Sequence, residues 1–130
     1  MTYLIDTSVW ITYFSRSHQQ SVQHVKSRVR ELLTREMVYV CGTVIAECIQ
    51  GFLREEERQY IETLFSFPFL ETTREIFEHA GWMNRDLLIR GQGLVLTDCL
   101  IAATALVHDC TLVTADRHFE RFPDLKLLLL

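Results

Sequence analysis

The alternation of short apolar runs with longer segments of helical periodicity constrains the fold of this chain more than any other feature. The apolar, β-rich runs lie at residues 3–5, 37–41, 69–71, 111–114 and 126–130. Strands that alternate with helices are joined by right-handed crossovers, and the helices then cover the sheet. The sequence therefore predicts an α/β fold with a mainly parallel sheet covered on both faces.

The segments between these runs have helical spacing, and capping residues mark their ends. The expected helices cover residues 7–14, 18–35, 44–52, 54 to near 68, 72–90 and 97–107. Thr7, Thr72 and Thr97 are the expected N-caps, and Gly91 is the expected residue after the end of the fifth helix. Residues 99–107 are almost wholly apolar, which predicts a helix buried on all sides.

The length of 130 residues is typical of one domain with one hydrophobic core. The longest apolar stretch, residues 99–107, is far shorter than the ~20 residues that a membrane span needs. The N-terminus shows neither a basic segment nor a secretory cleavage pattern. We therefore expect a single domain over residues 1–130, no membrane crossing and a cytoplasmic location.

Cysteines and histidines do not form the clusters that zinc sites require. Cys41, Cys48, Cys99 and Cys110 each lie alone inside an apolar segment, where free cysteine behaves as a small buried hydrophobic residue. The five histidines are scattered singly along the chain. Because zinc is bound by closely spaced Cys or His ligands, we expect no zinc centre and four reduced core cysteines.

The net charge of −4 runs against the basic footprint of most nucleic-acid-binding proteins. One or two divalent cations bound by carboxylates would bring it to −2 or 0. Arginine outnumbers lysine eleven to two, and guanidinium groups suit bidentate contacts to phosphate. A basic helix face with Lys26, Arg28, Arg30 and Arg35 is either a surface that guides RNA or, as the favoured interpretation, a merely solvated surface. The composition is compatible with RNA without indicating it.

Four acidic residues stand where an open parallel sheet binds its ligands. Such sheets hold ligands beyond the carboxyl ends of their strands, at the point where strand order reverses. Asp6 and Asp116 lie just past two expected strands, and Asp98 lies in the first turn of the buried helix. Glu47 projects about 130° away from the middle of its helix's apolar arc, if each residue turns ~100°.

Carboxylates that converge without a cation repel one another, which raises the pKa of at least one of them. Magnesium favours oxygen ligands, and a magnesium-bound water can attack a phosphodiester bond. Taken singly, the residues also have ordinary roles open to them. Asp98 would stabilise a helix N-terminus, Asp6 and Asp116 would be turn or capping residues, and Glu47 would be a solvated glutamate. Taken together, they predict a metal site and phosphodiester hydrolysis.

The segments around these carboxylates resemble the motifs of PIN domains, and especially of the VapC-type toxins of toxin–antitoxin pairs. The matching stretches are Leu4–Trp10, the apolar helix around Glu47, Thr97–Ala105 and Leu112–Phe119. They occur in order over essentially the whole chain. The stretch around Asp98 is the most specific of them.

This resemblance implies a three-layer α/β/α fold and cleavage of single-stranded RNA with Mg²⁺ or Mn²⁺. Carried over by position, Asp6, Glu47, Asp98 and Asp116 are the acidic quartet, which supplies both the metal ligands and the catalytic residues. The resemblance further implies a homodimer and an antitoxin whose C-terminal segment wraps around the toxin. One departure is His118, because some relatives have another acidic residue at that place.

Neighbouring hydroxyls and other function classes leave some alternatives open. Ser8 and Thr114 are placed either to bind a metal-bound water or to cap and turn the chain. A dehalogenase-type phosphatase needs a second aspartate where this chain has Ser8, and a Rossmann domain needs a glycine loop after the first strand. A receiver-like domain needs a well-placed lysine. The alternative that stays open is a catalytically inactive PIN-like protein or RNA-binding module.

Overall fold

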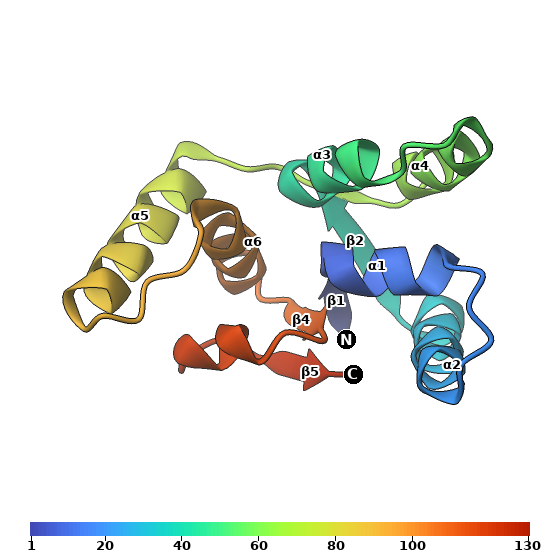
Figure 1. Ribbon diagram of the computed structural model, residues 1–130. Helices are drawn as coiled ribbons and strands as arrows, with labels where there is room; N and C mark the ends of the chain where they lie inside the picture. The colour runs from blue at the N-terminus through green and yellow to red at the C-terminus, as the bar shows by residue number, and fades with distance from the viewer.

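The computed structural model describes residues 1–130 as a five-stranded sheet with helices on both faces (Figure 1). The strands are β1 (Thr2–Ile5), β2 (Met37–Cys41), β3 (Phe69–Leu70), β4 (Thr111–Thr114) and β5 (Leu127–Leu129). The α-helices are α1 (Thr7–Phe14), α2 (Gln20–Arg35), α3 (Gly42–Gly51), α4 (Arg58–Phe65), α5 (Arg74–Ile89) and α6 (Leu96–Val107). Two short 3₁₀ helices, η1 (Glu55–Glu57) and η2 (Arg117–Arg121), complete the chain.

The sheet has the strand order β3-β2-β1-β4-β5, and every neighbouring pair is parallel. The chain builds outward from β1 through β2 to β3, then returns to the other side of β1 and continues through β4 to β5. The order therefore reverses between β1 and β4, where Leu4 lies opposite Leu112. In open α/β sheets, ligands bind beyond the carboxyl ends of the strands at such a point.

The direction of the crossovers places the helices in two layers. Right-handed connections from β1 to β2 and from β2 to β3 put α1 to α4 on one face, and the return from β3 to β4 puts α5 and α6 on the other. Figure 1 shows α1 and α2 on one side of the sheet and α5 and α6 on the opposite side. The predicted α/β fold with both faces covered is confirmed, and the sheet is parallel throughout.

The α6 helix is buried between the sheet and α5, as its apolar sequence predicts. All residues from Ile101 to Ala105 are 0% exposed. Three of the five are alanines, whose small side chains allow α5 and β4 to pack closely on either side. The hydroxyl of Thr104 donates to the carbonyl of Leu100 at 2.7 Å, so the one polar side chain in this stretch is satisfied. A rigid, buried helix thus carries Asp98 in its first turn.

The helices are found where the periodicity predicts them, but all three predicted N-caps are wrong. Asp6, rather than Thr7, caps α1, because its carboxylate is the stronger acceptor for the helix amides. Thr73 caps α5 in place of Thr72. The α6 helix begins two residues early behind Val95, whose side chain offers no acceptor, so Thr97 lies inside the helix.

Gly91 ends α5 as predicted. Its φ of +72° is the left-handed conformation that glycine adopts without steric cost. The amide of Gln92 donates to the carbonyl of Leu87 at 2.8 Å, and the amide of Gly91 donates to the carbonyl of Leu88 at 3.0 Å. These two bonds form a Schellman motif, which turns the chain back toward α6.

The four cysteines are buried in the core, as the sequence predicts. All four cysteines are buried and unpaired. Burial raises the pKa of the Cys41 thiol to about 11 and that of Cys48 to about 12, which keeps both thiols protonated and unreactive at neutral pH. None of the helices has the length and apolar character of a membrane span.

Candidate active site

The structure brings the four predicted carboxylates to one cleft of about 270 Å³ at the switch point of the sheet. Asp6 comes from the junction of β1 and α1, Glu47 from α3, Asp98 from α6 and Asp116 from the segment after β4. The other lining residues are Thr7, Ser8 and Ile11. Four separate elements of the fold therefore contribute one acidic group each.

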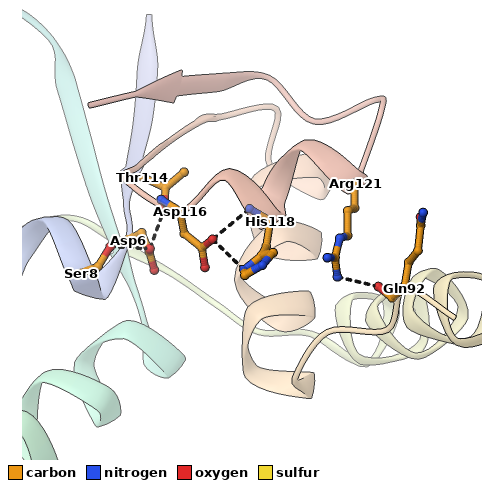
Figure 2. Close-up of polar contacts among 7 residues, drawn as sticks. All are labelled: Asp6, Ser8, Gln92, Thr114, Asp116, His118 and Arg121. Carbon is orange, nitrogen blue, oxygen red and sulfur yellow. Dashed lines mark hydrogen bonds and ion pairs between the residues drawn. The ribbon is translucent and has the colours of Figure 1, made fainter.

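Asp6 is the most buried of these carboxylates, with 6% of its surface exposed. Its amide continues the sheet by donating to the carbonyl of Val113 at 2.9 Å. Its Oδ1 accepts from the amide of Thr7 at 2.8 Å, and its Oδ2 accepts from the hydroxyls of Ser8 and Thr114, each at 2.9 Å (Figure 2). Three donors fix this carboxylate in one orientation, at the N-terminus of α1.

Burial makes Asp6 reluctant to ionise despite these donors. Burial raises its pKa above 3.8, the three hydrogen bonds from Thr114, Ser8 and Thr7 oppose the rise, and the charge of Asp116 adds to it. The outcome is a raised pKa. A cation in the cleft would favour the charged form, because it offsets both the lost hydration and the repulsion.

Asp98 shows that the four carboxylates share one electrostatic environment. Burial is the largest cause that raises its pKa from 3.8 to about 6, and the charges of Asp6, Asp116 and Glu47 follow in that order. His118 acts in the opposite direction. The repulsion that the sequence predicts is therefore present in the folded protein.

Glu47 is held by the helix that Asp6 caps. The hydroxyl of Thr7 donates to Oε1 of Glu47 at 2.7 Å, which links α1 to α3 beside the cleft. The side chain is half-buried, so it is not the freely solvated glutamate of the alternative interpretation. Sequence reasoning assigned Thr7 to capping and missed this contact, because nothing local relates two residues that are 40 positions apart.

Asp116 is tied to Asp6 through Thr114. The hydroxyl of Thr114 accepts from the amide of Asp116 at 3.0 Å while it donates to Asp6 at 2.9 Å. On its other side, Asp116 Oδ1 accepts from the amide of His118 and lies 2.9 Å from the His118 ring Nδ1 (Figure 2). Asp116 thus caps η2 and lines the cleft, so the capping interpretation and the site interpretation apply to the same residue.

Side-chain clamps hold the loop that leads into α6. The side-chain amide of Asn84 donates to the carbonyl of Leu94 and accepts from its amide, both at 2.9 Å. Arg121 donates to the carbonyl of Gln92 at 3.0 Å (Figure 2). Because α6 starts directly after this loop, these bonds help to fix the position of Asp98.

The side chains of the cleft supply the ligand atoms that a hard divalent cation prefers. All of its polar side chains present oxygen atoms, the ligands that Mg²⁺ and Mn²⁺ prefer. No three Asp, Glu, His or Cys side chains come close enough together to enclose an ion by themselves. Magnesium keeps several of its waters and takes only one or two carboxylates directly, so an open set of carboxylates fits it.

Comparison with known proteins shows the family of this chain. The PIN domain family matches residues 3–125. Ribonuclease VapC19 of Mycobacterium tuberculosis is 32% identical over 126 residues, which are 95% of this chain and 96% of that protein. Ribonuclease VapC11 of the same organism is 29% identical over 120 residues, or 90% of this chain and 88% of that protein.

Solved structures show the same fold at lower identity. A chain of VapBC2 from Rickettsia felis, bound to a DNA fragment from its promoter, superposes with a TM-score of 0.83 at 22% identity and covers 99% of this chain and 98% of that chain. VapBC proteins are a family of toxin–antitoxin systems. The fold, the extent of the PIN match and the identity to VapC19 lead to one assignment. The chain belongs to the PIN-domain family, among the VapC-type ribonucleases.

Proposed function

We propose that this VapC-type ribonuclease hydrolyses RNA phosphodiester bonds internally, with Mg²⁺ or Mn²⁺ bound by Asp6, Glu47, Asp98 and Asp116. The observation that supports this most is the convergence of these carboxylates in one cleft at the switch point of the sheet. Like charges in one cleft favour a cation, and the raised pKa of Asp98 has burial as its largest cause and the charges of Asp6, Asp116 and Glu47 as further causes.

The chain's own groups hold this site in place. When bound, a divalent ion supplies an activated water and stabilises charge on the phosphoryl oxygens. Thr114 and Ser8 orient Asp6, and Thr7 orients Glu47. Such outer hydrogen bonds keep carboxylate ligands in a fixed geometry, so the hydroxyls are positioning residues in this account.

The chain is further proposed to be the toxin of a toxin–antitoxin pair, with a cognate antitoxin that covers the cleft. The support is the similarity to VapC ribonucleases and to the fold of VapBC proteins. Four unpaired cysteines fit a reducing compartment, so we place its action in the cytoplasm. Expression without the antitoxin should arrest growth, and expression of Asp98→Asn should not. Equal growth arrest by both would count against this role.

A homodimer is proposed from the apolar surface of α5 and the start of α6. Trp82, Leu88, Ile89, Val95 and Leu96 are each more than half exposed, at 62%, 62%, 70%, 63% and 56%. Large exposed apolar side chains gathered on neighbouring segments are typical of protein interfaces. Sedimentation of the partner-free protein should give a dimer that Leu88→Lys dissociates, and a monomeric wild type would contradict the proposal.

Cleavage by the purified, partner-free protein tests the enzymatic proposal. Structured and single-stranded RNAs are incubated with the wild-type protein in Mg²⁺, Mn²⁺ or a chelator. The same assays are run with Asp98→Asn and with the matched control Asp124→Asn. Asp124 is exposed and lies beside the opposite end of α6 from Asp98. We expect metal-dependent cleavage by the wild type and by Asp124→Asn, and none by folded Asp98→Asn. RNA binding without cleavage by any form would instead support the inactive binding-module alternative.

A further inference from the structure

The largest cleft of the protein, about 550 Å³, lies away from the carboxylates at the C-terminal end of α1. Its walls come from the end of α1, the loop that follows, α2 and α4. The basic and aromatic residues that line it are Arg16, His18, Lys26, Arg30, Tyr13 and Tyr60, and no acidic residue lines it. We call it the basic cleft.

The cations of the basic cleft have no carboxylate partners. No ion pair in the protein includes Arg16, Lys26 or Arg30. On the same helix, Arg28 and Arg35 both pair with Glu31, at 3.0 and 3.9 Å. The predicted basic face of α2 is thus divided. One part is neutralised by a neighbouring carboxylate, and the other faces the cleft with its charge uncompensated.

Aromatic rings beside these cations are held rigidly. Tyr60 stacks on Phe14 with ring centroids 4.6 Å apart and an interplanar angle of 13°. Tyr13 meets Phe14 edge to face at 5.1 Å, and Phe14 in turn stacks on the buried Trp10. Rigid rings next to uncompensated cations are the two features that bind single-stranded nucleic acid, since cations attract phosphates and rings stack on bases. An acidic peptide would use the cations but not the rings.

The carboxylate cleft lies at the N-terminal end of α1 and the basic cleft at its C-terminal end. Ser8 lines the carboxylate cleft and Ser15 lines the basic cleft. These residues are seven positions apart, which is two helical turns and about 10 Å at ~1.5 Å per residue. A stacked strand covers that distance in about three nucleotides at ~3.4 Å each. Figure 1 shows α2 and α4 near the end of α1 that leads into α2, and these elements form the walls of the basic cleft.

We propose that the basic cleft is a second subsite for the RNA strand that is cleaved at the carboxylates, and that it binds a phosphate and a base about three nucleotides from the cleaved bond. The inference rests on the proposed ribonuclease function. Arg16 and Arg30 would contact phosphate, and Tyr13 and Tyr60 would contact the base. Both contacts are independent of sequence, so the subsite would raise affinity without choosing the target.

Binding of fluorescent single-stranded RNA to the partner-free protein tests this subsite. In the non-cleaving Asp98→Asn background, Arg16→Ala with Arg30→Ala should weaken binding at least about 10-fold and should make the salt dependence shallower by about 0.7 in log–log slope, the value for one lost phosphate contact. Arg28→Ala, the matched control on the same helix, should change neither. In the chain that keeps Asp98, the double substitution should not affect cleavage of RNAs too short to reach the basic cleft.

Two results would contradict the proposed RNA subsite without bearing on the proposed role of the carboxylates. One is RNA binding by the double variant that equals binding by Arg28→Ala at every salt concentration. The other is unchanged RNA binding with loss of binding to a poly-glutamate peptide, which would make the cleft a peptide site. Absence of cleavage by the wild type bears on the proposed function instead, because RNA binding is measured in a variant that does not need to cleave.

Discussion

The two clefts at the ends of α1 have opposite charge and are built in different ways. The carboxylate cleft collects one acidic group from each of four elements, and hydrogen bonds from hydroxyls and amides hold three of them, Asp6, Glu47 and Asp116. The basic cleft places cations from two neighbouring segments beside a rigid aromatic cluster. Apart from His118 beside Asp116, neither cleft has a group of opposite charge from the chain itself. The difference in charge therefore assigns a different proposed ligand to each cleft, a divalent cation to the carboxylates and an RNA phosphate to the cations.

The largest expected effect is on the cleavage rate, and it distinguishes catalysis at the carboxylate cleft from RNA binding at the basic cleft. Glu47→Gln removes a proposed metal ligand, so the cleavage rate at saturating RNA should fall more than about 100-fold, beyond the loss typical of outer positioning groups. RNA affinity should change little. Single-turnover cleavage against RNA concentration measures both quantities.

The control for this substitution is Glu62→Gln, an exposed glutamate on α4 that forms no ion pair. It should cleave like the wild type. If Glu47→Gln weakens RNA binding while its cleavage rate at saturating RNA is unchanged, the assignment of catalysis to the carboxylate cleft is wrong.

A smaller effect is expected from the Thr114 hydroxyl, which links the Asp6 carboxylate to the backbone amide of Asp116. Thr114→Val keeps the shape of a fully buried side chain but removes the donor to Asp6 and the acceptor for the Asp116 amide. Cleavage should fall about 10- to 100-fold, the usual cost of losing an outer positioning group. Thr34→Val, at an exposed hydroxyl on α2, is the matched control. Unchanged cleavage by folded Thr114→Val would remove Thr114 from the positioning role.

The smallest effect concerns stability and follows from the pKa of Asp98. Its folded-state value of about 6 lies above the ordinary 3.8, so the metal-free protein loses stability as pH rises from about 4 to about 6. Asp98→Asn removes this cost and should stabilise the metal-free protein by about 1–2 kcal/mol at pH 7, less than the ~3 kcal/mol of the full shift because solvent screens this partly exposed group, and by nearly nothing at pH 4. Urea unfolding with chelator at both pH values measures it. An equal gain at both pH values would show that the ionisation of Asp98 is not the cause.

The sequence predicts the sheet and the acidic residues for the same reason. Short apolar runs define parallel strands, and strand ends bring Asp6 and Asp116 together because parallel strands end on one edge. Asp98 is predicted by its place in an otherwise apolar helix. The hydrogen bond from Thr7 to Glu47 is not predictable, because it depends on how α1 packs against α3.

On the basic face of α2, too, contacts within the helix are predictable from the sequence and contacts between helices are not. The pairing of Arg28 with Glu31 follows from their spacing on one helix. The placement of Arg30 near Tyr60 does not, since it requires α4 to pack against the end of α1. The sequence leaves RNA guidance and solvation open for the whole face, favours solvation, and does not separate the part that lines the cleft.

Calorimetric titration of Mn²⁺ into the partner-free protein at pH 7 tests the central claim most directly, because it measures the metal site without RNA. We expect saturable Mn²⁺ binding by the wild type and by Asp124→Asn, at least about 10-fold weaker Mn²⁺ binding by Thr114→Val, and no Mn²⁺ binding by Asp98→Asn. Saturable binding of equal strength by folded Asp98→Asn, or no binding by the wild type, would contradict the claim that these carboxylates form the metal site of a ribonuclease.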